Sequence, residues 1–181
     1  MIYLRNLTID DFDYLNSVEN NKSFWKYSFQ NKNYSKEDLI QFIYDSQLPL
    51  EQTNQIRFVI CKTETDEPLG FIDLFEIDFT KSQAGISILI SNSENRSKGY
   101  GKLSVKKICE YARKELKIKN LYCNISVDNI LSLNFFKSVG FKEISKNSNQ
   151  YVSSIDNQYE YIIQILQCPI NCIHYHHMSN Y

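Results

Sequence analysis

Hydrophobic residues recur along this chain with two periods, and each period predicts a different kind of element. Alternating or continuous apolar runs predict strands, whereas apolar residues spaced three or four apart predict amphipathic helices. Strands are expected at residues 1–7, 56–61, 69–79, 83–90, 120–127 and 159–166, with further strand material at Phe141 and around Tyr151. Helices are expected at residues 8–18, 35–43, 101–116 and 131–139.

The order of these elements predicts an α/β (α+β) fold with a mixed, mostly antiparallel sheet and flanking helices. Residues 64–68 have turn chemistry, so the strands on either side should form an antiparallel hairpin. A helix joins the strand that begins near Ala84 to the strand that ends near Val127, which indicates one parallel crossover. We find no internal repeat.

The bulk properties favour a single globular domain that acts on a small molecule. The chain has 181 residues, 43% of them hydrophobic, and we assign residues 1–166 to one domain and 167–181 to a C-terminal tail. A net charge of -1 argues against nucleic-acid binding and against a polybasic membrane anchor. No apolar run has the length of a signal peptide or of a membrane span, so we expect a cytoplasmic protein. Five cysteines, an odd number, favour reduced thiols over a disulfide framework.

The segment from Ile86 to Lys102 has the pattern of an anion site. An apolar strand passes through a polar loop into Gly99 and Gly101, which open the next helix. Main-chain N–H groups at a helix N-terminus lack intrahelical partners and bind phosphate, and glycines remove side chains that would obstruct it. The spacing matches neither a Walker loop nor a dinucleotide-binding loop. A plain surface turn is the alternative.

Two motifs in this part of the chain resemble signatures of the GNAT (GCN5-related N-acetyltransferase) superfamily. Residues 96–101, RSKGYG, resemble its R/Q-x-x-G-x-G/A motif, and residues 129–141 resemble its second signature, N-x-x-[AS]-x-x-[LF]-[YF]-x-x-x-G-F. The resemblance extends over residues 1 to 166 and is nearest the branch of ribosomal-protein N-terminal and polyamine N-acetyltransferases. It implies a splayed central strand, acetyl-CoA as co-substrate, and direct attack of an amine in a ternary complex.

The same resemblance implies which residues hold the coenzyme. Main-chain groups of the splayed strand pair with the pantetheine arm, the loop amides receive the pyrophosphate, and Asn129 contacts the arm from the other side, although a helix N-cap is an equal reading of Asn129. The expected cofactor-binding residues are Ile88, Leu89, Ile90, Arg96, Ser97, Lys98, Gly99, Tyr100, Gly101, Lys102, Asn129, Ser132 and Phe136.

A catalyst of this kind must remove a proton from the acceptor, because an alkylammonium with a pKa of about 10.4 has no lone pair with which to attack. In the strand at 69–79, period two places Asp73 among apolar residues, where desolvation would raise its pKa and make it a base or an ammonium site. A structural hydrogen bond is the other reading. Many relatives carry an acid where this chain has Gly85, so Glu19 is the fallback.

The departing thiolate also needs a proton. In many relatives a tyrosine of the second signature supplies it, but the matching residue here is Phe136. The thiolate therefore leaves unaided, since a thiol pKa of about 8.5 tolerates this, or Tyr100, Tyr151 or a water substitutes.

Two further segments carry weaker signals. Trp25, Tyr27 and Phe29 lie where related enzymes form the acceptor pocket and could hold an amine by cation–π contact, although helix packing is the alternative. The tail from Cys168 to His177 contains every histidine, but its spacing matches no common zinc module. We expect a frayed or partner-contacting terminus and no metal.

The leading hypothesis is therefore an acetyl-CoA-dependent N-acetyltransferase. Its partner would be a small-molecule amine, such as a polyamine or an amino sugar, or a peptide N-terminus. Dimers are common among the relatives, so a homodimer is expected. The alternatives are a non-catalytic sensor that binds acyl-CoA, favoured by Phe136 and Gly85, and a nucleotide-phosphate binder.

Overall fold

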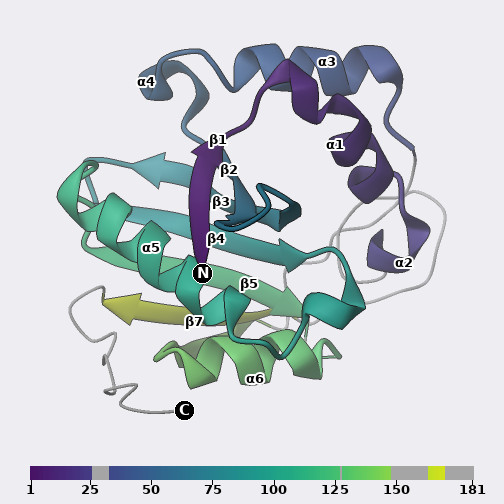
Figure 1. The fold of residues 1–181 in the computed structure, drawn as a ribbon. Helices are drawn as coiled ribbons and strands as arrows, with labels where there is room; N and C mark the ends of the chain where they lie inside the picture. The colour runs from purple at the N-terminus through teal and green to yellow at the C-terminus, as the bar shows by residue number, and fades with distance from the viewer. Residues whose placement is uncertain (26–32, 127, 148–162, 170–181) are drawn as a thin grey trace, which may run out of the picture. The chain divides into compact units, whose positions relative to one another are not determined.

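The computed structural model describes residues 1–25, 33–126, 128–147 and 163–169 (Figure 1). The chain divides into two compact units. The first consists of residues 1–77 and 86–108, and the second consists of residues 78–85 and the chain from Cys109 onward.

The first unit contains helices α1 to α4, strands β1 and β2 and most of strand β3. Its elements are β1 (Ile2–Asn6), η1 (Ile9–Asp11), α1 (Phe12–Glu19), α2 (Lys22–Trp25), α3 (Lys36–Asp45), α4 (Leu50–Thr53), β2 (Ile56–Lys62), β3 (Pro68–Asp78), the end of β4 (Gln83–Ile90), η2 (Ser93–Asn95) and the start of α5 (Tyr100–Lys114).

The strands of this unit pair in the order β1, β2, β3, β4. The β1–β2 and β2–β3 pairs are antiparallel, and the second of them places Arg57 directly opposite Asp73. Gly70 of β3 lies against the main chain of β4. A Cβ atom at this position would be 1.8 Å from the Leu89 carbonyl oxygen, so no residue with a side chain fits there without moving a strand.

Helices α1 and α3 pack side by side over a shared apolar cluster (Figure 1). The three- and four-residue spacing of their apolar positions explains this, because it gathers buried side chains on one stripe of each helix. The buried cluster consists of Leu7, Leu15, Val18, Leu39, Ile43, Val59, Cys61 and Phe71. The start of α3 is fixed by a capping box, in which Ser35 Oγ accepts from Asp38 N at 3.0 Å and Asp38 Oδ2 accepts from Ser35 N at 3.0 Å.

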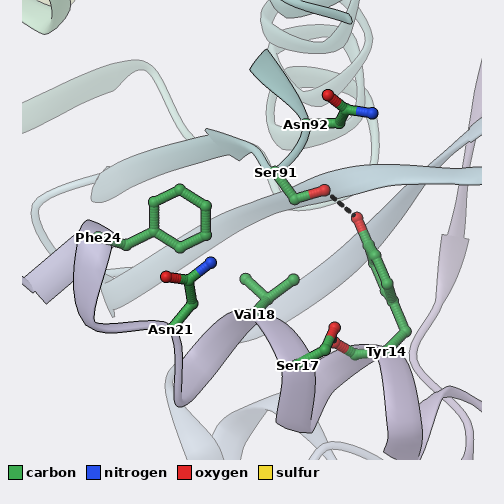
Figure 2. Close-up of a pocket in the computed structure, with 7 residues that line it drawn as sticks. All are labelled: Tyr14, Ser17, Val18, Asn21, Phe24, Ser91 and Asn92. Carbon is green, nitrogen blue, oxygen red and sulfur yellow. Dashed lines mark hydrogen bonds between the residues drawn. The ribbon is translucent and has the colours of Figure 1, made fainter. Parts of the chain in front are cut away.

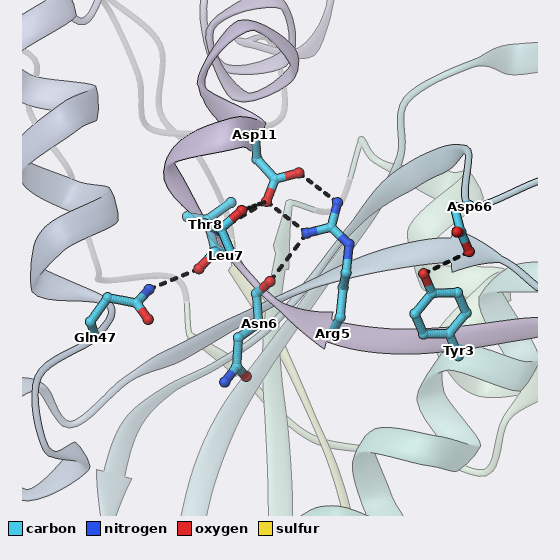
Figure 3. A network of polar contacts seen from close by, with 8 residues as sticks. All are labelled: Tyr3, Arg5, Asn6, Leu7, Thr8, Asp11, Gln47 and Asp66. Carbon is cyan, nitrogen blue, oxygen red and sulfur yellow. Dashed lines mark hydrogen bonds and ion pairs between the residues drawn. The ribbon is translucent and has the colours of Figure 1, made fainter.

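An ion pair fastens β1 to the turn that leads into α1 (Figure 3). Arg5 donates from Nη1 and Nη2 to the two carboxylate oxygens of Asp11, at 2.7 and 2.6 Å. Thr8 N also donates to Asp11, at 2.9 Å. Burial acts to raise the pKa of Asp11, but these hydrogen bonds outweigh it and hold that pKa below its usual range.

The second unit consists of the first residues of β4, the end of α5, β5 (Asn120–Ser126), α6 (Ile130–Ser138), β6 (Lys142–Asn147) and β7 (Ile163–Pro169). Strand β4 pairs with β5 in parallel, as the crossover predicts, and β5 pairs with β7 and β7 with β6 in antiparallel fashion. The parallel ladder ends at Gly85, while β4 continues to Ile90.

The expected mixed, mostly antiparallel α/β fold is therefore confirmed. Helices α2 and α4 were not expected, because four residues are too few to show a helical period. Strand β7 runs to Pro169 and so passes Leu166, where the predicted strand ends. The segment around Tyr151 lies outside the described residues. Within the described ranges, we find no helix long and apolar enough to cross a membrane.

Candidate active site

The loop between β4 and α5 contains the short helix η2, followed by two residues with positive φ angles. Asn92 caps η2 by accepting from Glu94 N at 2.9 Å. Ser97 and Gly99 then adopt positive φ angles of 60° and 84°. Glycine takes such an angle without strain, which explains its use at the residue before α5. The first hydrogen bond that closes a turn of α5 runs from Leu103 N to Gly99 O, at 3.1 Å.

Main-chain donors of this loop are available to an anion. Among the described residues, no main-chain carbonyl accepts from the N–H groups of residues 97–102, as expected for the first turn of a helix. A Cβ atom at Gly99 would meet nothing within 4 Å, so the space over this residue is open. Arg96, Lys98 and Lys102 are all exposed nearby in the sequence. A diphosphate group fits this chemistry.

Arg96 connects this loop to two neighbouring elements. Its Nε donates to the Ile90 carbonyl oxygen at 3.1 Å, and its guanidinium carbon lies 5.9 Å from the centre of the Phe24 ring in α2. The first residue of the motif therefore ties the end of β4 to the helix that follows α1. Ile88, Leu89 and Ile90 are half-buried, in the part of β4 beyond the parallel ladder.

The other expected cofactor residues belong to the second unit. Asn129 caps α6, because its side-chain oxygen accepts from Ser132 N at 3.2 Å, and this cap does not use its amide nitrogen. Phe136 is only 4% exposed and meets Phe135 and Phe141 edge-on, with ring centres 5.2 and 5.0 Å apart. It is a core residue with no proton to give.

A cluster of charged residues occupies the first unit at β2 and β3. Arg57 donates from Nε and Nη2 to the two oxygens of Asp73, at 2.8 and 3.0 Å, and from Nη1 to Glu19 of α1. Ser87 of β4 donates to Asp73 at 2.8 Å. The period-two pattern predicts that Asp73 has only apolar neighbours, and this prediction is wrong. The pattern describes the residues of one strand and says nothing about Arg57, which lies opposite Asp73 on β2.

Aromatic rings flank the guanidinium of this cluster. The guanidinium carbon of Arg57 lies 5.0 Å from the ring centre of Phe42 and 5.2 Å from that of Phe71. Burial acts to lower the pKa of Arg57, but the carboxylates of Asp73 and Glu19 outweigh it and hold that pKa above its usual range. The pair of strands thus carries a permanent cation at Arg57, which was not among the residues predicted for the site. The one sequence signal for it was the presence of a charged residue in the otherwise apolar stretch from Ile56 to Cys61.

A small hollow opens beside the end of β4 (Figure 2). Its volume is about 160 Å³. Tyr14 and Ser91 both line it and are hydrogen-bonded to each other, with 2.8 Å between their hydroxyl oxygens (Figure 2). Burial raises the pKa of Tyr14, against an opposing effect of the Ser91 hydrogen bond, so its hydroxyl stays protonated at neutral pH. The lining residues are uncharged: Tyr14, Ser17, Val18, Asn21, Phe24, Ser91 and Asn92.

The remaining sequence-based candidates fall elsewhere. The indole N–H of Trp25 donates to the Glu19 carbonyl oxygen at 3.0 Å, so this ring is bound to the end of α1, while Phe24 lines the hollow. Tyr27, Phe29 and Tyr151 lie outside the described residues. Tyr100 begins α5 and is half-buried.

The cysteines and histidines of the tail fall mostly beyond what the structure describes. Cys168 lies in β7, whereas Cys172 and all three histidines are outside the described residues. Within the part of the chain that is described, no group of three or more His, Cys, Asp or Glu side chains is arranged to hold a metal ion. Cys61, Cys109 and Cys123 are buried and are not part of a disulfide.

Comparison with known proteins agrees with this geometry. The family model "Acetyltransferase (GNAT) domain" matches residues 2–142. Spermidine N(1)-acetyltransferase of Escherichia coli K12 is 26% identical over 165 residues, which cover 91% of this chain and 84% of that protein.

Solved structures share the fold. Spermidine N-acetyltransferase from Vibrio cholerae, in complex with CoA and spermine, superimposes with a TM-score of 0.82 at 19% identity, covering 95% of this chain and 97% of that one. A dodecameric structure of the same Vibrio enzyme has a TM-score of 0.74 at 19% identity and covers 99% and 98% of the two chains. Because the family model matches residues 2–142, more than half of the chain, the chain belongs to the GNAT acetyltransferase family and is an acetyl-CoA-dependent N-acetyltransferase.

Proposed function

We propose that this enzyme transfers the acetyl group of acetyl-CoA to a primary amine of a polyamine. The relatives of known activity that it resembles over most of its length act on spermidine. The observation within the chain that carries the proposal is the cluster of Glu19, Arg57 and Asp73. This cluster contains two carboxylates and one guanidinium, so acidic groups outnumber basic groups among its three residues, although the whole chain is nearly neutral.

This local charge favours acceptors that carry several ammonium groups. Two opposite unit charges about 8 Å apart attract by about 2 kcal/mol at an effective dielectric constant of 20, and salt reduces this further at exposed sites. Each additional ammonium group of a polyamine adds such an attraction. An amino sugar or a peptide N-terminus supplies only one ammonium group and gains less.

We assign the chemical roles as follows. The main-chain N–H groups of residues 97–102 hold the diphosphate, and the main chain of Ile88, Leu89 and Ile90 pairs with the pantetheine arm. Asp73 accepts an N–H of the incoming ammonium, and Glu19 contributes charge. The amine attacks the thioester carbon directly, and the carbon–sulfur bond breaks as the new carbon–nitrogen bond forms. The bound ammonium loses one proton to solvent before the attack, which frees the nitrogen lone pair, and the nitrogen loses a second proton as its bond to carbon forms. The departing thiolate takes up one proton from solvent, so one proton is released overall.

The experiment is an acceptor panel with the wild-type chain. Free thiol release from acetyl-CoA is followed with spermidine, spermine, glucosamine and a short peptide with a free N-terminus, and mass spectrometry identifies the products. We expect acetylated spermidine or spermine and the highest kcat/KM for these two acceptors. Raising the salt concentration should raise their KM more than that of glucosamine.

Three outcomes contradict the proposal. A kcat/KM for glucosamine or the peptide above that of both polyamines would assign the enzyme to another acceptor. Saturable binding of acetyl-CoA with no amine-stimulated thiol would favour the non-catalytic sensor. Protection from heat by ATP but not by CoA would instead favour a nucleotide site.

We also propose that the chain forms a homo-oligomer. The Vibrio relative is described as dodecameric, and its chain is covered almost completely by this one. Light scattering coupled to size-exclusion chromatography gives the mass directly, and a mass near the 21.4 kDa of one chain at micromolar concentration would contradict the proposal.

A further inference from the structure

Arg57 connects the acceptor-side carboxylates in a defined geometry. It lies opposite Asp73 in the β2–β3 register and binds both oxygens of that carboxylate through Nε and Nη2, while Nη1 reaches Glu19. A guanidinium group is planar and rigid, so a two-point contact of this kind fixes the plane of the carboxylate as well as its position. A lysine at the same place would supply the charge without this fork, that is, without two N–H groups that bind both carboxylate oxygens at once.

Counting hydrogen bonds shows how little of Asp73 remains available. Its two oxygens offer about four lone-pair positions. Arg57 occupies two of these and Ser87 occupies a third, at distances of 2.8, 3.0 and 2.8 Å. About one position is left for a donor from outside, and Arg57 and Ser87 together determine which one it is.

The cluster is reachable from solvent although it is set in a buried sheet. The side chains of Arg57, Glu19 and Asp73 are 20%, 22% and 18% exposed, whereas the neighbouring Ile72 and Leu74 of β3 are fully buried. Removing three charges this far from water is costly, and apolar replacements of buried ion pairs are often at least as stable. Stability alone therefore does not account for the arrangement.

We propose that Arg57 is a positioning residue for the amine acceptor: it orients Asp73 so that one lone pair of the carboxylate faces the substrate ammonium. This inference rests on the proposed role of Asp73 in binding the acceptor. It does not require that the acceptor be a polyamine. Arg57 itself forms no contact with the reacting atoms and acts only through Asp73 and Glu19.

Arg57→Lys tests this inference because it keeps the positive charge and removes the fork. We expect KM for the best amine acceptor to rise about tenfold, with KM for acetyl-CoA unchanged within about twofold and kcat reduced much less than kcat/KM. A purely structural residue would instead lower Tm and alter both KM values together.

The chain offers a matched control in Arg5→Lys. Arg5 forms the same kind of two-point ion pair with Asp11, in the same unit. This variant should lower Tm and leave the amine KM unchanged within about twofold. A rise in the amine KM equal to that of Arg57→Lys would show that any broken fork has this effect, and it would overturn the proposal.

Ser87→Ala provides a second test that retains the ion pair. Losing one donor to Asp73 loosens the carboxylate, so the amine KM should rise about threefold while KM for acetyl-CoA is unchanged. If Arg57→Lys does not fold, this variant decides, and an unchanged amine KM overturns the inference. All variants are measured with whichever amine the panel finds best. A failure of the polyamine assignment is therefore seen in the wild type, and a failure of the Arg57 assignment is seen only in the variants.

Discussion

Replacing Gly99 by glutamate tests the proposal that the loop at residues 97–102 binds the diphosphate of the cofactor. Gly99 has a φ of 84°, and the space over its Cα is open to at least 4 Å. A Cβ atom at this position therefore meets no protein atom, and a longer side chain extends into the space that we propose for the diphosphate. Gly99→Gln is the matched control, since glutamine has the same shape without the charge.

Two effects contribute to the expected loss, and their magnitudes differ. The left-handed φ strains any residue other than glycine by about 1–2 kcal/mol, so both variants should lower Tm by a similar few degrees in a chain of this size. The added carboxylate also repels the diphosphate. A unit charge about 5 Å from one phosphate charge costs about 3 kcal/mol at an effective dielectric constant of 20, which corresponds to more than a 100-fold loss of affinity.

Titration calorimetry with CoA at two salt concentrations measures both effects. Gly99→Glu should bind CoA at least about tenfold more weakly than Gly99→Gln, and the gap should narrow as salt screens the repulsion. Tm of the two variants without CoA should agree. Equal affinities for Gly99→Glu and the wild type, or equal losses in the two variants, would refute the placement of the diphosphate over this residue.

Three further predictions concern stability. Gly70→Ala places a Cβ 1.8 Å from a carbonyl oxygen of β4, so we expect a loss of about 3 kcal/mol or more in urea unfolding, and an unchanged midpoint would contradict the close approach. Because its folded-state pKa is lowered, Asp11 contributes stability that is present above its unfolded value of about 3.9 and is lost as pH falls through the folded value. Urea midpoints from pH 6 to pH 2 should therefore fall more steeply for the wild type than for Asp11→Asn, and parallel curves would argue against the Arg5 pairing. Tyr14→Phe and Ser91→Ala should show a coupling of about 1 kcal/mol in a double-mutant cycle, and strictly additive losses would deny their hydrogen bond.

The local elements of this fold were readable from the chain because their signals lie close together. The three- and four-residue spacing from Val105 to Ala112 places buried residues on one stripe of α5 wherever that helix packs. The capping box at Ser35 is likewise a matter of residues three apart. Four-residue helices such as α2 give no such signal, because one turn cannot show a period.

The candidate site was only partly readable. The anion loop could be predicted from the position of Gly99. Its positive φ angle and the main-chain N–H groups beside it, which have no main-chain acceptor among the described residues, both depend on a few neighbouring residues. Asp73 could be placed on a strand, but its partner could not be identified, because Arg57 is sixteen residues away and meets it only through the strand register. The pairing of Tyr14 with Ser91, seventy-seven residues apart, was equally hidden.

The sequence by itself indicated the family and the order of helices and strands, and it predicted a loop for acetyl-CoA, because each depends on short-range spacing that the chain carries wherever it folds. Only the tertiary structure decided the electrostatics around Asp73 and the burial of Phe136 in an aromatic core. Coulomb interactions and hydrogen bonds act between groups a few ångströms apart in space, and only folding brings residues distant in sequence to that range.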